Sequence, residues 1–538
     1  MSTPMSTVLI VGSGPTGLTL ACDLARRGIG VRIIEKSPHF PRSSRAKGPN
    51  PRSLEVFADL GVADRIIAAG GAIRVMRKYR DGQVITDTDP HQGTAPTPGA
   101  PYDRGTLIPQ WRLEEILRHR LAEYGVRVEL DAELVEFTQD DAGVTARLAD
   151  GRCVEASYLV GCDGGHSTVR KALGVRFDGT TDETQVMVCG DVDLDGLDRD
   201  IWHQWFDADG AVMLCPIPGT VRSWWFQAGP ERDGEGGLVA PSLAGFQRLF
   251  DRHARLPGIT LGDATLLSTY RVNVRMVDRF RVGRVFLAGD AAHVHPIAGG
   301  LGMNTGIQDA FNLGWKLAMV ASGQAGAGLL DTYEEERLPV AAWTLDVSSD
   351  RLRAVLEATK KPGGGLDVVG TPETSTLGLG YRWSSLSWDG DGREGRLRAG
   401  DRAPDAPCRD FAGSVVRLFE VFAGAHFTLL GFGSRSRESL HRVASEWGET
   451  VCICAVDADP AGLADPEGGG LADPEAGLAD PDGHARGAYG ITGDALVLIR
   501  PDNHVALTAP ADGPDTILNY QAMIAAIMEL QRPPAHRR

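Results

Sequence analysis

The chain has 538 residues and a formal net charge of −16 at pH 7, so it can hold two or three domains with separate cores and lacks the basic surface typical of nucleic-acid-binding proteins. No apolar run is long enough for a transmembrane helix and the N-terminus lacks the basic start of a signal peptide, which predicts a cytoplasmic protein without a membrane partner. The eight cysteines form no C-x-x-C pair, so the sequence indicates neither a disulfide framework nor a zinc ribbon.

The N-terminal segment has the pattern of a dinucleotide-binding unit. An apolar strand leads into Gly12-Ser13-Gly14-Pro15-Thr16-Gly17, then a helix, then a second strand that ends at Glu35. In this pattern Gly12 allows a tight turn, Gly14 lets the backbone approach a pyrophosphate, and Gly17 lets the helix pack on the strand. Glu35 can accept hydrogen bonds from a ribose 2′-OH and would repel a 2′-phosphate, which favours FAD or NAD over NADP at this site.

A second glycine turn follows the strand predicted at 158–162. It contains Asp163-Gly164-Gly165 and opens another helix. Ser167 and Arg170 lie one helical turn apart there and form a candidate phosphate-facing pair. Asp-Gly alone is a common turn and indicates nothing about function.

Residues 184–268, with a smaller piece at 73–101, are predicted to form an antiparallel sheet, because short β-like stretches rich in Trp and Phe are separated by Gly and Pro. Alternation places Trp224 and Phe226 on one face, but it leaves open whether that face borders a pocket or the sheet's own core.

The segment 283–310 is the most informative one. An apolar strand runs into Gly289-Asp290, a glycine-rich turn and the start of a helix near Gly302. A helix N-terminus suits an anion or a polarised carbonyl, and an acid at the strand end suits a sugar hydroxyl. FAD satisfies both with its electron-poor ring and its ribityl chain. His293 and His295 lie in this loop without a partner at metal-ligand spacing, so we expect local hydrogen bonding and no metal.

A glycine-rich connection at 357–400 precedes a third domain. Its predicted elements are a strand at 426–431, a helix at 437–447, strands at 450–456, 495–500 and 505–508, and a helix at 516–530. Gly462, Gly470 and Gly477 each open a Gly-Leu-Ala-Asp-Pro unit. We expect this repeat insertion, 462–483, to be a flexible surface segment with too little apolar content to pack.

The three glycine motifs, in this order, resemble those of the class A flavoprotein monooxygenases. These are the single-component FAD-dependent aromatic hydroxylases related to para-hydroxybenzoate hydroxylase, and the likeness is strongest to actinobacterial hydroxylases of aromatic polyketides. The resemblance implies an α/β fold with a Rossmann-like FAD-binding domain, a β-sheet substrate domain and a non-redox thioredoxin-like C-terminal domain. The expected bounds are 1–72, 102–183 and 269–356 for the first, 73–101 and 184–268 for the second, and 401–538 for the third.

The resemblance also implies roles for single residues. It places Arg45 over the flavin pyrophosphate, Gln110 and Arg112 beside the flavin, Asp163 near FAD and the pyridine nucleotide, and Asp290 on the ribityl chain. Without the resemblance, Arg45 and Arg112 would be taken as surface charges. The expected cofactor set is Gly12, Gly14, Pro15, Thr16, Gly17, Glu35, Lys36, Arg45, Gln110, Arg112, Asp163, Asp290, Gly300, Leu301, Gly302, Met303 and Asn304.

In this family the sheet covers the substrate. The substrate candidates are Trp205, Met213, Trp224, Phe226, Pro296 and Ile297. The chain departs from the usual Pro-Pro-x-Gly-Gly-Gln-Gly loop, because Ile297 and Leu301 stand where the family has proline and glutamine. Both changes make the pocket wall more apolar, which suits a large polycyclic substrate.

The implied activity is hydroxylation of a phenolic, polycyclic aromatic compound through a flavin C4a-hydroperoxide. FAD would be the cofactor, NADPH or NADH a transient co-substrate, and O2 the oxygen donor. No catalytic acid or base is assigned; Arg45 and the backbone of 302–304 are the best supporting groups. The alternatives are Baeyer–Villiger oxygen insertion, an NAD-dependent dehydrogenase, and a non-catalytic flavin- or ligand-binding protein. A monomer or a homodimer is expected.

Overall fold

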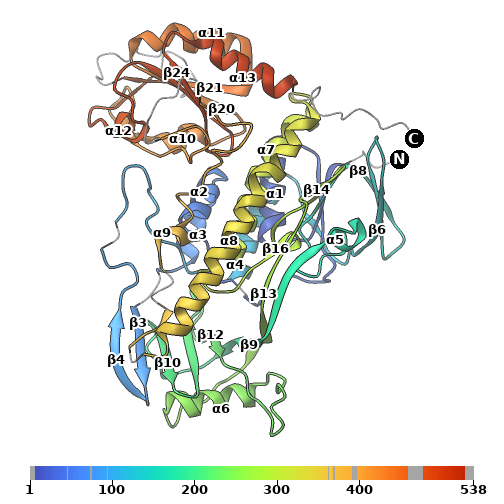
Figure 1. Ribbon diagram of the computed structural model, residues 1–538, viewed down its shortest axis with the longest axis vertical. Coiled ribbons are helices and arrows are strands. Elements are labelled where there is room, and N and C mark those ends of the chain that lie inside the picture. The colour runs from blue at the N-terminus through green and yellow to red at the C-terminus, as the bar shows by residue number, and fades with distance from the viewer. Residues whose placement is uncertain are drawn as a thin grey trace.

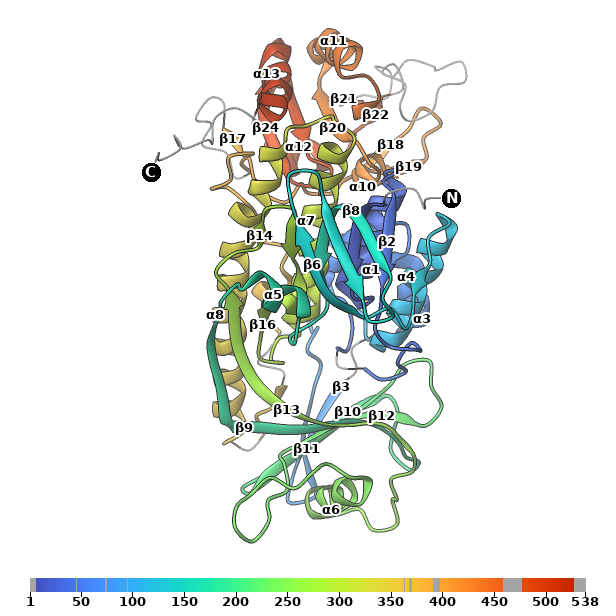
Figure 2. The same ribbon diagram turned by 90° about the vertical axis from the view of Figure 1, so that its right-hand side faces the viewer.

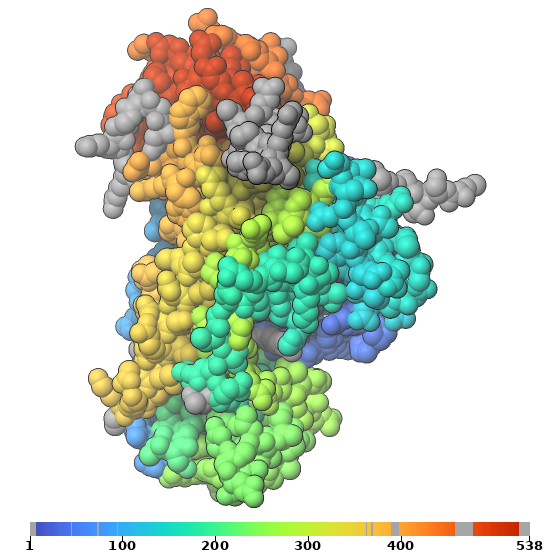
Figure 3. All heavy atoms as spheres, turned by 45° about the vertical axis from the view of Figure 1, so that its right-hand side comes forward, coloured from blue at the N-terminus to red at the C-terminus, as the bar shows by residue number. Residues whose placement is uncertain are grey.

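The computed structural model describes residues 6–44, 46–72, 75–93, 95–361, 363–366, 370–389, 397–457 and 477–526. Within these residues the strands form three sheets, which follow one another along the long axis of the molecule (Figure 1). Figure 3 shows the C-terminal domain in orange and red at one end and the green segment of the second sheet at the other.

The first sheet is the Rossmann-like core of the FAD-binding domain. Its parallel strands lie in the order β15-β8-β1-β2-β5. Helices α1 (Pro15–Arg26), α4 (Gln110–Glu123) and α7 (Leu301–Ala321) contribute buried apolar residues to the same core. Parallel strands covered on both faces consist of near-continuous apolar runs, as β1 does. The strand bounds are β1 (Ser6–Val11), β2 (Val31–Ile34), β5 (Val128–Glu129), β6 (Leu134–Gln139), β7 (Val144–Leu148), β8 (Cys153–Gly161), β14 (Arg281–Val282) and β15 (Val285–Leu287).

Shorter helices complete this part of the chain. Helix α2 (Pro51–Asp59) begins where the Asn50 side chain accepts a hydrogen bond from Ser53 N, with Pro51 at the first helical position. Helices α3 (Ala63–Ala69) and α5 (Thr168–Leu173) follow. The long α8 (Asp331–Ala358) runs along the molecule toward the second sheet (Figure 1).

The second sheet, called the roof sheet below, has the order β16-β13-β9-β12-β11-β10-β3-β4. The hairpin β3–β4 joins it through parallel pairing of β3 with β10, as expected for 73–101. The strands β9 and β13 run from the FAD-binding domain into this sheet, so the domain bounds expected at 183 and 268 fall inside continuous strands. Helix α6 (Leu243–Ala254) covers the outer face (Figure 2). The bounds are β3 (Val75–Arg80), β4 (Gln83–Thr88), β9 (Phe177–Asp193), β10 (Ile201–Asp207), β11 (Gly210–Pro216), β12 (Ser223–Ala228), β13 (Ala264–Val277) and β16 (His293–Val294).

The third sheet forms the C-terminal domain. Strand β20 is parallel to β21 and antiparallel to β23, and β23 is antiparallel to β24. The thioredoxin-like assignment stays a prediction, supported by this strand order. The helix predicted at 437–447 is confirmed as α11 (Arg437–Trp447), and the last helix, α13, spans Pro514–Ala526, where the described residues end. The remaining bounds are β17 (Trp388–Asp389), β18 (Pro407–Arg409), β19 (Val415–Arg417), β20 (Phe427–Phe432), β21 (Val451–Asp457), β22 (Leu478–Ala479), β23 (Ala495–Ile499), β24 (Val505–Pro510), α9 (Pro372–Ser375), α10 (Leu418–Phe422) and α12 (His484–Tyr489).

The third copy of the Gly-Leu-Ala-Asp-Pro repeat is ordered, so the prediction of a flexible surface segment is wrong there. Leu478 and Ala479 form β22, are 1% and 0% exposed, and pair with β21 and β18. These two apolar side chains are sufficient to hold the segment in the fold, because its backbone also forms the hydrogen bonds of the sheet. The first two copies lie outside the described residues. Within the described residues no helix combines the length and apolarity needed to cross a bilayer.

Candidate active site

A cavity of about 2390 Å³ extends from the N-termini of α1 and α7 to the inner face of the roof sheet. Ligand pockets usually measure about 300–1,000 Å³, so this cavity has room for a large cofactor and a second molecule together. Three of the sequence-predicted regions border it: Gly14 to Thr16, Gly300 to Asn304, and the roof residue Met213.

The glycines of the first motif have different roles. Gly12 has φ +103°, and a Cβ there would lie 2.4 Å from the Cys162 carbonyl oxygen. A Cβ at Gly17 would lie 2.1 Å from the Gly12 oxygen. Both positions are therefore glycine because backbone packs on backbone. Gly14 has open space around its Cβ position and, with Pro15 and Thr16, borders the cavity at the start of α1. An anionic group fits here, because the first N–H groups of a helix lack intrahelical partners.

Glu35 lies at the end of β2, beside this turn. Its carboxylate accepts hydrogen bonds from Ser13 N and Ser13 Oγ, both at 3.1 Å, and from Ser37 N at 3.1 Å. Burial opposes ionisation, but these donors outweigh it and lower the pKa of Glu35. The carboxylate is thus held in its charged form at the end of β2, and its expected contact with a ribose stays a prediction. The neighbouring Lys36 is exposed, and neither residue borders the cavity.

Gln110 opens α4 at the cavity wall, as expected. Its backbone N–H donates to Ser44 Oγ (2.9 Å), and its Oε1 accepts from Ala46 N (3.3 Å). Arg112 does not border the cavity. It lies two residues after Gln110 on α4, so its side chain points to another side of the helix. There it pairs with Glu115, and its side chain is 45% exposed. Arg45 lies outside the described residues.

Sequence reasoning missed Glu114, one turn after Gln110. It borders the cavity, is 6% exposed and accepts a hydrogen bond from Gln110 Nε2 at 2.8 Å. Burial raises the pKa of Glu114 to about 7, although Gln110 and Arg118 act in the opposite direction. A single glutamate in a mixed helix carries no sequence signal for this.

The second glycine turn borders the cavity with Gly164, Gly165, His166 and Arg170, whereas Asp163 and Ser167 do not border it. Asp163 Oδ2 accepts from Thr168 N (2.7 Å) and Val169 N (3.1 Å) at the start of α5. The guanidinium of Arg170 donates to the carbonyls of Ala291 and Gly165, so only Arg170 of the expected phosphate-facing pair lies at the cavity wall. The carboxylate of Asp163 retains a buried Oδ1 without a partner among the described residues.

The loop before α7 presents its backbone to the cavity. Gly299 and Gly300 have φ of +88° and +61°, a conformation that favours glycine, and Gly300 is the N-cap of α7. The Asn304 side chain serves the fold: its Oδ1 accepts from Asn50 N (2.9 Å) and its Nδ2 donates to Gly300 O (2.7 Å). The backbone N–H groups left open to a ligand are those of Leu301, Gly302 and Met303, which precede the first intrahelical hydrogen bond. Asp290 is exposed and borders the cavity, together with Pro296, Ile297, Leu301, Gly302 and Met303.

The roof candidates divide between the two faces of the sheet. Trp205 and Trp224 do not reach the cavity; they pack with α6 in a separate core. Phe226 borders the cavity, but its ring stacks on Phe246 of α6, with 4.4 Å between the centroids. The inner face instead carries Met213, as expected, and Trp202 and Trp225, which sequence analysis missed. The single-residue shift from Trp224 to Trp225 changes the face because side chains alternate along a strand.

These features fit FAD. Two helix N-termini provide partial positive charge for the pyrophosphate and for the pyrimidine edge of the ring. The open space around Gly14 lets a pyrophosphate approach the backbone, and Asp290 supplies an acceptor for a ribityl hydroxyl. The cavity runs from the N-terminus of α1, where the pyrophosphate fits, to the N-terminus of α7, where the ring fits.

Comparisons with known proteins agree with this geometry. The FAD binding domain family matches residues 5–348, and the family of aromatic-ring hydroxylase C-terminal domains matches residues 397–528. A flavin-dependent monooxygenase of Mycobacteroides abscessus is 41% identical, over 96% of this chain and 100% of the relative. The chain belongs to the FAD-dependent aromatic hydroxylases.

The names of two further relatives state the compound on which each acts. The 6-methylpretetramide 4-monooxygenase of Streptomyces rimosus is 35% identical, over 95% of this chain and 92% of its own. A crystal structure of aklavinone-11 hydroxylase with FAD and aklavinone is 29% identical, with a TM-score of 0.79, over 98% of this chain and 100% of that one. This aromatic hydroxylase is therefore a flavin-dependent monooxygenase.

The histidine pair of the hydroxylase is part of a buried hydrogen-bonded chain, as its position suggested. His293 Nε2 lies 2.7 Å from Asp309 Oδ2, and its Nδ1 lies 2.8 Å from His295 Nε2. Arg337 Nε donates to the other Asp309 oxygen at 2.7 Å. Burial opposes ionisation of Asp309, but Arg337 and His293 keep its pKa below the usual range. These hydrogen bonds anchor the loop that leads into α7.

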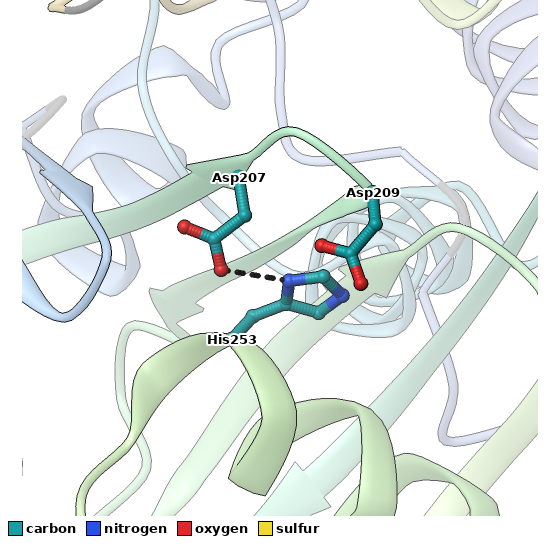
Figure 4. Close-up of side chains that lie close together, drawn as sticks. All are labelled: Asp207, Asp209 and His253. Atoms are coloured by element: carbon teal, nitrogen blue, oxygen red, sulfur yellow. Dashed lines mark hydrogen bonds and ion pairs between the residues drawn. The ribbon is translucent and has the colours of Figure 1, made fainter.

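A separate cluster of Asp207, Asp209 and His253 lies at the turn between β10 and β11 (Figure 4). Asp207 Oδ2 lies 3.1 Å from His253 Nδ1, and Asp207 Oδ1 accepts from Asp81 N at 2.9 Å. Arg255 lies 3.8 Å from the same carboxylate. One Asp207 oxygen therefore joins the β10–β11 hairpin to α6, and the other joins it to the turn between β3 and β4, so Asp207 makes structural contacts here.

Proposed function

We propose that this hydroxylase uses FAD, NADPH or NADH, and O2 to add one oxygen atom to a phenolic, polycyclic aromatic substrate of the polyketide type. The observation that carries the proposal is the continuity of the cavity, which joins the flavin-side helix N-termini to an apolar roof large enough for several fused rings. The names of the relatives, an aklavinone hydroxylase and a 6-methylpretetramide monooxygenase, support the substrate class. The enzyme would act in the cytoplasm as a monomer or homodimer.

Bound FAD would accept a hydride from the nicotinamide and activate O2 for transfer to the aromatic ring. The protein supplies orientation and electrostatics. The α1 N-terminus would hold the pyrophosphate through the backbone N–H groups of Gly14 and Thr16, since Pro15 has none. The backbone N–H groups of Gly302 and Met303 would stabilise negative charge on the ring.

The inner face of the roof sheet excludes water from the cavity. Trp202, Trp225 and Met213 present an apolar face toward the cavity, and Ile297 extends it on the flavin side. A dry pocket prevents side reactions with water at the reacting atoms and strengthens the electrostatic contacts around them. The side chains of this face therefore select flat apolar substrates and exclude water from the reacting atoms.

The test is a visible spectrum of the purified protein, followed by NADPH oxidation in air with and without a panel of polyphenolic polyketides. We expect a flavin spectrum and oxidation strongly stimulated by one compound, with a product that carries one added oxygen. NMR of the product's carbon skeleton separates ring hydroxylation from Baeyer–Villiger insertion. A protein that stays colourless with added FAD, or a compound-independent oxidation rate, contradicts the proposal.

A further inference from the structure

We propose that Lys47 and Asp191, at the inner face of the roof sheet, bind the substrate phenol as its phenolate, with Lys47 facing the ring oxygen and Asp191 taking the proton. This inference rests on the proposed function, because it requires a phenol in the cavity. It assigns an acid–base pair that the sequence left unassigned.

Asp191 belongs to a lateral row of inward-facing residues in the roof sheet. On β9 it lies opposite Trp225 of β12, which lies opposite Cys215 of β11. The next inward row contains Gln227 and Met213, which are also register partners. Because register partners on neighbouring strands share a face, Asp191 stands on the cavity side with Trp225. Asp191, Trp225, Gln227 and Met213 all border the cavity.

Lys47 reaches this face from the segment that precedes α2. Its backbone oxygen accepts from Ile108 N at 2.8 Å, which fixes the segment. Its Nζ donates to Gln227 Oε1 at 2.9 Å and lies 5.8 and 5.7 Å from the ring centroids of Trp202 and Trp225. Aromatic faces at this distance stabilise a cation. Burial lowers the pKa of Lys47. The ammonium group is therefore partly desolvated and held in the half of the cavity that receives the substrate.

Asp191 is 3% exposed, and only one of its oxygens is used. Oδ2 accepts from Ser44 N at 2.9 Å. Oδ1 is buried and has no hydrogen-bond partner among the described residues. Burial raises the pKa of Asp191 to about 6, against the opposing effects of Ser44 and Lys47. An unpaired buried carboxylate oxygen is unfavourable, so this position favours a ligand that brings a donor. A phenol O–H is such a donor.

The two groups influence each other's ionisation, yet the described residues form no ion pair between them at 4.0 Å or less. A phenol oxygen between them would meet both. The O–H bond of the phenol breaks, the proton forms a bond to Asp191 Oδ1, and the negative charge moves to the ring oxygen that faces Lys47. No proton is exchanged with solvent and the total charge of the site is unchanged. The ring gains electron density, which favours transfer of an electrophilic oxygen.

The experiment uses the oxidised, FAD-loaded enzyme without NADPH, so that no turnover occurs. The probe is 1,8-dihydroxyanthraquinone, whose phenolate absorbs at longer wavelength than its phenol. Near neutral pH we expect the wild-type protein to bind the probe with a phenolate spectrum and to release no proton into a weakly buffered solution. Lys47→Met should lower the ratio of bound phenolate to bound phenol by about tenfold, which corresponds to one pKa unit of the bound phenol. Lys47→Arg should restore it, because the charge returns.

Asp191→Asn separates the two roles. With the acceptor removed, any phenolate that Lys47 stabilises must send its proton to solvent, so we expect about one proton released per site, measured with a pH indicator. Lys171→Met is the matched control, because Lys171 is an exposed lysine of α5 that does not border the cavity, and its variant should behave as wild type. The FAD content of every variant is checked from its visible spectrum, so that misfolded protein is recognised.

A wild-type complex that keeps the phenol spectrum, or a Lys47→Met complex with the wild-type spectrum, overturns the pair. Failure to bind any phenol overturns the pair and the proposed function together. A probe bound as phenolate through Lys47, combined with NADPH oxidation that no phenol stimulates, supports the pair while it contradicts the proposed function.

Discussion

Glu336 of α8 and Arg500 of the C-terminal domain form a bidentate ion pair, with Arg500 Nη1 and Nη2 2.6 and 2.9 Å from the two carboxylate oxygens of Glu336. Both side chains are 0% exposed. The same carboxylate accepts from Lys316 Nζ of α7 at 2.6 Å. These contacts join the C-terminal domain to α8 and to α7, the helix that begins at the flavin-side loop.

Glu336→Ala should therefore destabilise the whole chain. It leaves two buried cations without their shared partner, and breaking a buried ion pair in this way costs about 3–5 kcal/mol. The free energy of unfolding, measured by urea titration with far-UV circular dichroism, checks this. Glu357→Gln, an exposed position on the same helix, should change it by less than about 0.5 kcal/mol. An unfolding curve for Glu336→Ala that overlaps with wild type would show that the ion pair does not join the domains.

Local patterns predicted the elements of the fold better than their contacts. The N-terminal glycine motif and the helix at 437–447 could be read from the sequence, because turn chemistry and periodicity act over a few residues. The Glu336–Arg500 pair spans 164 residues, and nothing in the local sequence around Glu336 indicates it.

The site was predicted in the same uneven way. Backbone-dictated positions such as Gly14 and Gly300 border the cavity as expected. Side-chain directions were harder: Arg112 points to solvent, and Trp224 faces α6. Which face of the roof sheet is inward depends on where α6 packs, and alternation alone does not contain that information. Lys47 and Glu114 were missed because burial, rather than residue type, makes them notable.

Alanine substitution at two glycines of the first motif should affect different properties, FAD binding in one case and stability in the other. Gly14 has φ −72°, and a Cβ there meets no atom within 4 Å, so Gly14→Ala should fold normally but bind FAD about tenfold more weakly, since the methyl group enters the pyrophosphate position. Gly17→Ala should lose about 1–3 kcal/mol of stability, because its Cβ would lie 2.1 Å from a backbone oxygen.

Flavin-fluorescence titration measures the first effect and urea unfolding of the apoprotein the second. The two variants act as each other's control. If Gly14→Ala and wild type bound FAD with equal affinity, the pyrophosphate would not lie at the α1 N-terminus.

The adjacent tryptophans of β12 offer a similar contrast. Trp224 is 0% exposed and its Nε1 donates to Leu194 O at 3.2 Å, so Trp224→Phe should cost about 2 kcal/mol of stability through the lost hydrogen bond and packing, with KM unchanged. Trp225→Phe alters the cavity wall and should raise KM for the aromatic substrate about fivefold, the equivalent of about 1 kcal/mol. Steady-state kinetics and thermal unfolding of both variants test this. A larger KM effect from Trp224 than from Trp225 would contradict the assignment of the inner face.

Glu114 should make stability depend on pH. Its pKa rises from 4.5 to about 7 on folding, mainly through burial, so the folded state keeps a proton that the unfolded state releases over this range. The contribution of Glu114 to stability is therefore complete below about pH 4.5 and is lost as the pH rises toward 7. Glu114→Gln, which can still accept from Gln110, removes this dependence. As the pH rises from about 5 to 8, the free energy of unfolding of Glu114→Gln should increase relative to that of wild type, on the order of 2–3 kcal/mol in all.

Urea unfolding of the apoprotein at both pH values gives this difference directly. Glu115→Gln is the matched control, because Glu115 is the next residue on α4 and pairs with Arg112 at the surface; its pH dependence should follow that of wild type. If Glu114→Gln and wild type keep a constant difference across this range, then Glu114 ionises normally in the folded protein. The carboxyl group beside Gln110 would then carry a negative charge at neutral pH and would repel the FAD pyrophosphate from this part of the cavity.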